Sequence, residues 1–168
     1  MTHPIHPIIV HFPIALLSVA VFFDWLGIIT GREGFRRTAL HLLVVGILAG
    51  GTALLSGVLS EEAVEAAGVP EGAIEEHEEF AFFSMYAFGA VALLRWFFRN
   101  RWDETWRRAV YAVACVAALV LLGIAGYHGG DLVYEHGAGV KAVKPAPGLT
   151  STHSESAAPT ASSAKGPP

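Results

Sequence analysis

The chain has few charged residues and a single cysteine. Charged side chains make up 15% of its 168 residues, against 53% hydrophobic ones, and they lie in short blocks between long apolar runs. One cysteine, Cys115, excludes an internal disulfide, a Cys-x-x-Cys-His haem attachment and a zinc–cysteine cluster. The sequence also lacks a nucleophile elbow, a phosphate-binding loop and a catalytic pair of carboxylates. We therefore expect a protein that is not an enzyme.

Four apolar runs account for most of the chain. They cover roughly residues 7–29, 38–59, 80–98 and 109–127. A hydrocarbon core about 30 Å thick needs about 20 mostly apolar helical residues, so each run is long enough to cross a membrane. Short connections join the first run to the second and the third to the fourth. The sequence predicts an all-α, integral membrane, four-helix up-and-down bundle.

Arginine is distributed on one side of this predicted bundle. The eight arginines lie in or beside the first and third connections, whereas the acidic loop at residues 60–79 has no Lys or Arg. The positive-inside rule then places the arginine connections in the cytoplasm and both termini outside, in a bacterial inner membrane. Three lysines in the C-terminal segment, Lys141, Lys144 and Lys165, argue weakly against this orientation.

The C-terminal segment differs in composition from the rest. Residues 143–168 are rich in Pro, Ser, Thr and Ala and have no apolar periodicity. We expect a disordered external tail there and a four-span domain at residues 1–142. We also expect Gly129 and Gly130 to end the fourth span.

Histidines gather at the outer ends of the predicted spans. They come from the first, third and fourth spans and the segment that follows: His6, His11, His77, His128 and His136. Imidazoles from several helices of one bundle can hold haem b, and they also suit zinc or copper. The sequence therefore predicts a haem site drawn from His11, His77, His128 and His136, or a metal site formed by His6, His11 and His77.

The predicted site leaves alternatives open. His11 lies about 6 Å below the start of its helix, so we expect it to be the most buried ligand. Pro13 frees the carbonyl of Ile9 and should make the helix irregular there. Histidines at an interface can also simply bond lipid headgroups or backbone carbonyls. At the cytoplasmic ends, Asp24 and His41 can form a charge pair, and Arg95 lies at a similar depth.

Three parts of the sequence resemble a known family. The segment HPIIVHFPIALL, a histidine at the start of the third span and the segment GGDLVYEHGAGV are similar to an uncharacterised bacterial family of small membrane proteins, domain-of-unknown-function family 2231 (DUF2231). The resemblance covers about residues 5 to 141. The residues that carry it are His6, Pro7, His11, Phe12, Pro13, His77, Gly129, Gly130, Leu132, Val133, Tyr134, His136 and Gly137.

The resemblance implies a four-span inner-membrane module whose relatives occur beside, or fused to, cytochrome c or iron–sulfur domains. A redox subunit that binds a cofactor is therefore the leading hypothesis. Its partner would be a separate cytochrome c or iron–sulfur protein, and we expect no nucleic-acid partner. The alternatives are a structural or assembly module without a cofactor, and a small transporter or proton pathway in which Asp24 and His41 connect to the outer histidines.

Overall fold

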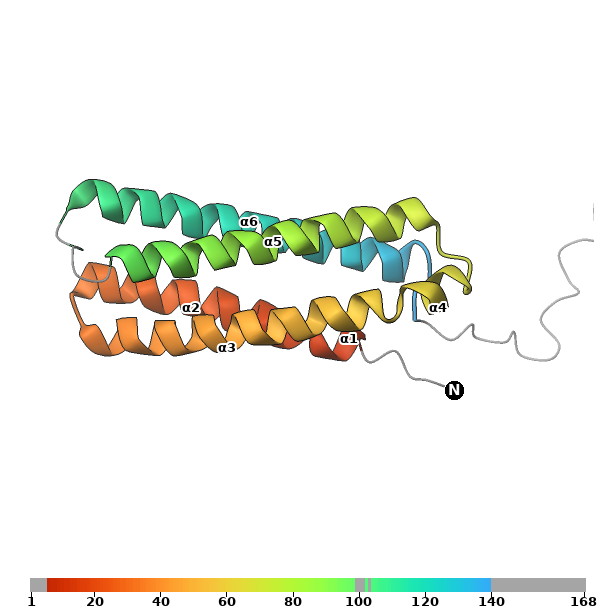
Figure 1. Ribbon diagram of the computed structural model, residues 1–168, viewed down its shortest axis with the longest axis horizontal. Coiled ribbons are helices and arrows are strands. Elements are labelled where there is room, and N and C mark those ends of the chain that lie inside the picture. Colours follow the sequence, from red (N-terminus) through yellow and green to blue (C-terminus); the bar gives the residue numbers. More distant parts are fainter. Residues whose placement is uncertain (1–5, 99–101, 103, 140–168) are drawn as a thin grey trace, which may run out of the picture.

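The protein is a bundle of four long helices arranged as two hairpins. The computed structural model describes residues 6–98, 102 and 104–139, so the predicted tail at 143–168 lies outside it. The helices are α1 (His6–Ile9), α2 (His11–Thr30), α3 (Glu33–Val58), α4 (Glu61–Glu65), α5 (Glu71–Phe98) and α6 (Thr105–Tyr134). Figure 1 shows α2 beside α3 and α5 beside α6, and these are the most extensive helix contacts. The predicted all-α bundle is confirmed.

Four helices are long and apolar enough to cross a membrane. They are α1 with α2 (His6–Thr30), then α3, α5 and α6. Hereafter, the histidine end is the end of the bundle at α1 and α4, and the arginine end carries the connections after Thr30 and Phe98. Each of the four predicted runs thus forms a helix of membrane-spanning length and hydropathy, and α3, α5 and α6 each begin before the predicted starts.

The end of α6 differs from the prediction. The helix continues through Gly129 and Gly130 to Tyr134, so the prediction that these glycines end it is wrong. The chain turns instead at Gly137, which has φ 68°, and the Gly137 N–H donates to the Val133 carbonyl at 3.1 Å. A left-handed glycine of this kind closes a helix because it needs no room for a Cβ.

A short interruption separates α1 from α2. Pro13 has no N–H, so the Ile9 carbonyl receives no helical hydrogen bond from it, and α1 ends at Ile9. Val10 keeps helical angles of φ −60° and ψ −26°, and its N–H donates to the His6 carbonyl at 3.1 Å. The predicted irregularity is confirmed, and α1 continues the direction of α2 in Figure 1.

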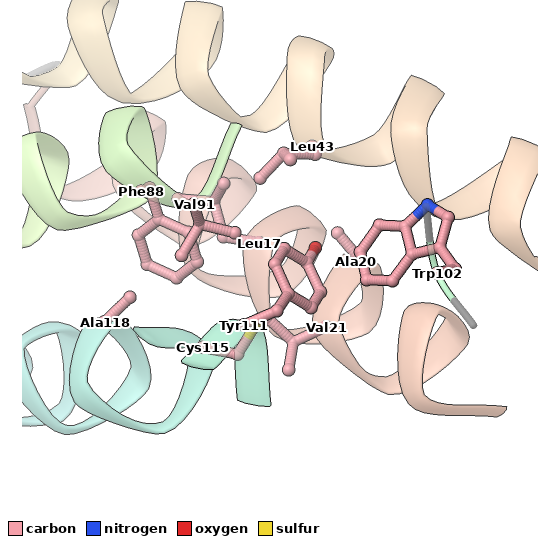
Figure 2. Close-up of a cluster of buried hydrophobic side chains, with 10 residues drawn as sticks. All are labelled: Leu17, Ala20, Val21, Leu43, Phe88, Val91, Trp102, Tyr111, Cys115 and Ala118. Carbon is pink, nitrogen blue, oxygen red and sulfur yellow. The ribbon is translucent and has the colours of Figure 1, made fainter. Parts of the chain in front are cut away.

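The apolar core lies nearer the arginine end than the histidine end. Figure 2 shows it as a layer to which all four long helices contribute. Leu17 of α2, Phe88 of α5 and Cys115 of α6 are fully buried in it, and Leu43 of α3 is 2% exposed. This layer packs the two hairpins against each other on the arginine side of the middle of the bundle.

The two hairpins repeat one packing pattern. Four of the six buried residues of α2 have a buried counterpart 71 positions later in α5, and four of the five in α3 have one 72 positions later in α6. The matched pairs in the first helices are Pro13/Ser84, Leu17/Phe88, Ala20/Val91 and Asp24/Arg95. Those in the second helices are Ala39/Tyr111, Leu43/Cys115, Gly46/Ala118 and Ala53/Ala125.

Matched residues also contact each other across the bundle. The rings of His6 and His77, again 71 positions apart, lie 6.3 Å apart at one end, and Asp24 pairs with Arg95 at the other. Contact between equivalent positions is what a two-fold axis produces. We therefore infer a pseudo-two-fold axis that runs along the bundle between α2 and α5. It is approximate, because α3 contacts α5 more extensively than α2 contacts α6. Parallel repeats about such an axis are known in membrane transporters.

An ion pair crosses this axis near the arginine end. Arg95 Nη1 contacts Asp24 Oδ1, and both side chains are almost fully buried. Tyr111 donates its hydroxyl proton to Asp24 Oδ2, and Arg95 donates to the Arg36 carbonyl. Asp24 thus pairs with Arg95 and not with His41, whose side chain is exposed, so the predicted Asp24–His41 pair is wrong. Lipid supplies no hydrophobic drive for helix association, so polar contacts of this kind help join the hairpins.

Replacing one member of this pair should destabilise the bundle. Asp24→Asn leaves the Arg95 guanidinium buried without its counter-charge, and we expect a loss of about 3 kcal/mol in the free energy of unfolding. The measurement is reversible unfolding in detergent. The control is Glu33→Gln, which removes the exposed carboxylate that lies 3.4 Å from Arg36 Nη1. This variant should change stability by less than about 0.5 kcal/mol. Equal effects of the two variants would contradict a structural role for the buried pair.

Candidate functional site

Two of the predicted histidines meet at the histidine end. The ring centroids of His6 and His77 are 6.3 Å apart, and the ring planes make an angle of 81°. His6 belongs to α1 and His77 to α5, so the pair joins the first helices of the two hairpins across the pseudo-two-fold axis. Both rings are partly buried.

Each ring is held by a backbone carbonyl of its own hairpin. His77 Nδ1 lies 3.0 Å from the Ala125 carbonyl, and His6 Nδ1 lies 3.1 Å from the Ala53 carbonyl. His6 Nδ1 also contacts Ser56 Oγ at 2.9 Å, while the Ser56 hydroxyl donates to the Ala53 carbonyl. A carbonyl can only accept, so Nδ1 carries the proton in both rings. When the rings are neutral, both Nε2 atoms therefore keep a free lone pair.

Glycines make room for these rings on the neighbouring helices. A Cβ added to Gly57 would lie 3.2 Å from His6 Cε1, and one added to Gly129 would lie 3.0 Å from His77 Cε1. Each glycine follows the bonded alanine by four residues, so both lie on one helix face. The repeat thus uses the same construction twice: a histidine, a carbonyl that accepts its proton, and a glycine beneath its ring.

A cavity of about 540 Å³ lies between the hairpins around the two histidines. Its lining is mostly apolar and comes from all four long helices. Glu61, Ser60 and Glu78 line it as well, and Ser84 lines it two helical turns beyond His77. Val69, Ile74 and Leu132 pack together at the histidine end, where the segment after α4 meets α5 and α6. The cavity is large enough for a cofactor.

The other predicted ligands do not join this pair, although His11 lines the same cavity. His11 is exposed, and its Nδ1 lies 2.7 Å from the Pro7 carbonyl of the preceding turn, so it is not the most buried of the histidines. His128 stacks on Phe80 with centroids 5.0 Å apart, and its Nδ1 is 3.8 Å from Glu76 Oε2. His136 is exposed. Within the residues that the structure describes, no three His, Cys, Asp or Glu side chains gather as a metal site requires.

Sequence reasoning missed two residues of this site, one residue of the buried ion pair, and the repeat that relates the two hairpins. Ser56 contacts His6, Ser84 lines the cavity, and Tyr111 completes the buried ion pair. A signal was present in the sequence, because His6, Ala53 and Gly57 are followed by an identical set at His77, Ala125 and Gly129. The 71- and 72-residue spacings match the two sets.

A methyl group at Gly129 should disturb the site. In Gly129→Ala the His77 ring must move and weaken its bond to the Ala125 carbonyl, so we expect a loss of about 1–3 kcal/mol in the free energy of unfolding. The matched control is Gly123→Ala on the same helix, where a Cβ meets nothing within 4 Å. That variant should gain up to about 1 kcal/mol from helix propensity. Unfolding in detergent checks both, and a Gly129→Ala protein as stable as the control would contradict the close contact.

Comparison with known proteins identifies the family of the chain. No curated protein and no solved structure matches the chain. The family described as "Predicted membrane protein (DUF2231)" matches residues 2–142, which include all four long helices and both histidines of the pair. The chain therefore belongs to the DUF2231 family of predicted membrane proteins.

Proposed function

We propose that this protein is a non-enzymatic redox subunit of the bacterial inner membrane that holds haem b between His6 and His77. The observation that carries the proposal is the pair itself. Two equivalent imidazoles line one mostly apolar cavity, and each has Nδ1–H bonded to a carbonyl, which leaves Nε2 as the atom able to bind a metal. A ligating histidine in proteins usually donates its other N–H in this way.

The ring separation supports haem coordination by both histidines. Two iron–nitrogen bonds of about 2 Å, with roughly 1 Å from each Nε2 to its ring centre, separate the two centroids by about 6 Å. The separation in the structure is 6.3 Å. A porphyrin supplies four further nitrogen ligands, so two imidazoles complete an octahedral iron. A metal ion alone needs more protein ligands, and the described residues do not bring a third to the pair.

Electron transfer is the chemistry that we propose for this site. Bound haem b would supply a one-electron couple at its iron, while the protein holds it in an apolar cavity. We further propose that the histidine end faces outward, because the arginines of the opposite end favour the cytoplasm. A separate cytochrome c or iron–sulfur protein would then exchange electrons at the histidine end.

A structural role for the histidines is the second candidate. The bonds from His6 to Ala53 and from His77 to Ala125 tie the two helices of each hairpin together. In that case the cavity holds no cofactor, and loss of either ring affects stability alone. A transport role has less support: the layer around Leu17 and Phe88 separates the histidines from Asp24, and both side chains are fully buried.

Haem binding is tested by the absorption spectrum of detergent-purified protein produced with sufficient haem. We expect a Soret band and reduced α and β bands of a six-coordinate haem. His6→Ala and His77→Ala should each lower haem affinity by at least about tenfold. His11→Ala should retain the haem, because His11 lines the cavity with an exposed ring that is not part of the His6–His77 pair.

The matched control is His41→Ala, which removes an exposed imidazole of α3 far from the cavity. Its spectrum should equal that of the wild type. A wild-type protein that takes up no haem would overturn the proposal. Loss of stability in His6→Ala and His77→Ala would then favour the structural role.

A further inference from the structure

Arginines from both hairpins meet around one tryptophan at the arginine end. Arg36 lies on the first turn of α3, and its guanidinium carbon is 4.9 Å from the centroid of the Trp102 ring. Arg108 lies on the first turn of α6, and its Nε donates to the Trp102 carbonyl. Trp102 is 9% exposed and packs edge-on against Tyr111, with ring centroids 5.1 Å apart. A buried ring thus brings one arginine of each hairpin to the same place.

The neighbouring helices hold Arg36 in this position. A Cβ added to the buried Gly27 of α2 would collide with Arg36 Cγ, so the stem of the arginine packs directly on the α2 backbone. Arg95 of α5 also donates to the Arg36 carbonyl. A side chain that is already ordered loses less conformational entropy when it binds a ligand. Arg36 is therefore preorganised to bind an anion.

The carboxylates at this end do not balance the arginines. Arg36 Nη1 lies 3.4 Å from Glu33 Oε2, a side chain that is 71% exposed, and Arg107 Nε lies 3.2 Å from Glu104 Oε2. Within the described residues, no carboxylate forms an ion pair with Arg108. The sequence places eight arginines and four carboxylates in and beside the two connections. The arginine end therefore keeps an excess of positive charge that an anion can neutralise.

The surroundings of this cluster indicate where the anion comes from. Trp96 and Phe97 of α5 and Trp106 of α6 are exposed large aromatic residues near the cluster. Tryptophan is enriched where the hydrocarbon of a bilayer meets the headgroups. Arginines that directly follow apolar spans lie at the depth of the lipid phosphates. Guanidinium N–H groups match phosphate oxygens in geometry and charge, so a phospholipid headgroup fits this position.

We propose that Arg36 and Arg108 bind the phosphate of an anionic phospholipid, while Trp102 fixes the two side chains. The lipid bridges the hairpins, because Arg36 belongs to the first and Arg108 to the second. Its acyl chains lie along the apolar surfaces of the spans. Basic pockets between membrane helices are known to hold headgroups in this way. A zwitterionic lipid fits less well, because its own cation meets the excess of arginines. The site lies at the end of the bundle opposite the histidines and does not depend on haem.

Lipid binding by the full chain purified in detergent tests this inference. The probes are dioleoylphosphatidylglycerol, dioleoylphosphatidylcholine and inorganic phosphate, each added at physiological salt. Native mass spectrometry measures bound lipid, and thermal unfolding measures stabilisation. We expect phosphatidylglycerol to bind at least about fivefold more tightly than phosphatidylcholine and to raise the unfolding temperature, whereas inorganic phosphate should not raise it. Arg108→Gln should lower the affinity for phosphatidylglycerol by about tenfold, the scale of one hydrogen bond between charged groups.

The matched control is Arg37→Gln, which removes an exposed arginine one residue further along α3. It should change this affinity by less than about twofold, because salt screens exposed charges that make no direct contact. Arg36→Gln should weaken lipid binding as Arg108→Gln does. Equal affinities for the two lipids would overturn the inference. An equal loss in Arg37→Gln and Arg108→Gln, or equal stabilisation by inorganic phosphate, would also overturn it.

Discussion

The buried pair of Asp24 and Arg95 is the contact on which the rest of the arrangement depends. Neither hairpin gains hydrophobic free energy by leaving lipid for its neighbour, so the register between hairpins depends on shape and on polar contacts. The pair joins equivalent positions across the pseudo-two-fold axis, and Tyr111 adds a third group to it. With these positions fixed, Leu17 and Phe88 lie at the same level of the bundle and pack together in one buried layer. The two hairpins are then aligned along their length as far as the histidine end. His6 and His77 then meet across the axis.

The two ends of the axis use the repeat in opposite ways. At the arginine end the equivalent residues, Asp24 and Arg95, have opposite charges, so they attract each other across the bundle. Each charge is thereby paired, and neither is left alone at membrane depth. At the histidine end the equivalents are identical, and so are the carbonyl-bearing alanines and the glycines beneath the rings. Identical donors at equivalent positions of two helices are suited to a ligand that is itself nearly symmetric. This match between an apolar cavity and a symmetric donor pair favours a planar cofactor over an isolated metal ion.

The sequence predicted the fold well and the site only in part. Length and hydropathy were sufficient to predict four helices of membrane-spanning length in two hairpins, because the membrane thickness restricts the solutions. The sequence could not identify which histidines converge, because convergence depends on helix rotation and on the interruption near Pro13. His11 was expected to be buried, yet the irregular turn leaves it exposed beside the Pro7 carbonyl. The repeat was missed because most matched positions share burial and not residue type, as Asp24 and Arg95 illustrate.

Electron paramagnetic resonance of the ferric, haem-loaded protein tests most directly whether His6 and His77 ligate one iron together. Their ring planes make an angle of 81°. Two nearly perpendicular imidazoles leave the iron orbitals that they contact almost equal in energy, and this produces a low-spin signal with very large anisotropy. We predict that signal for the wild type. A high-spin ferric signal, or a low-spin signal of the moderate anisotropy that parallel imidazoles give, would contradict joint ligation in the geometry described.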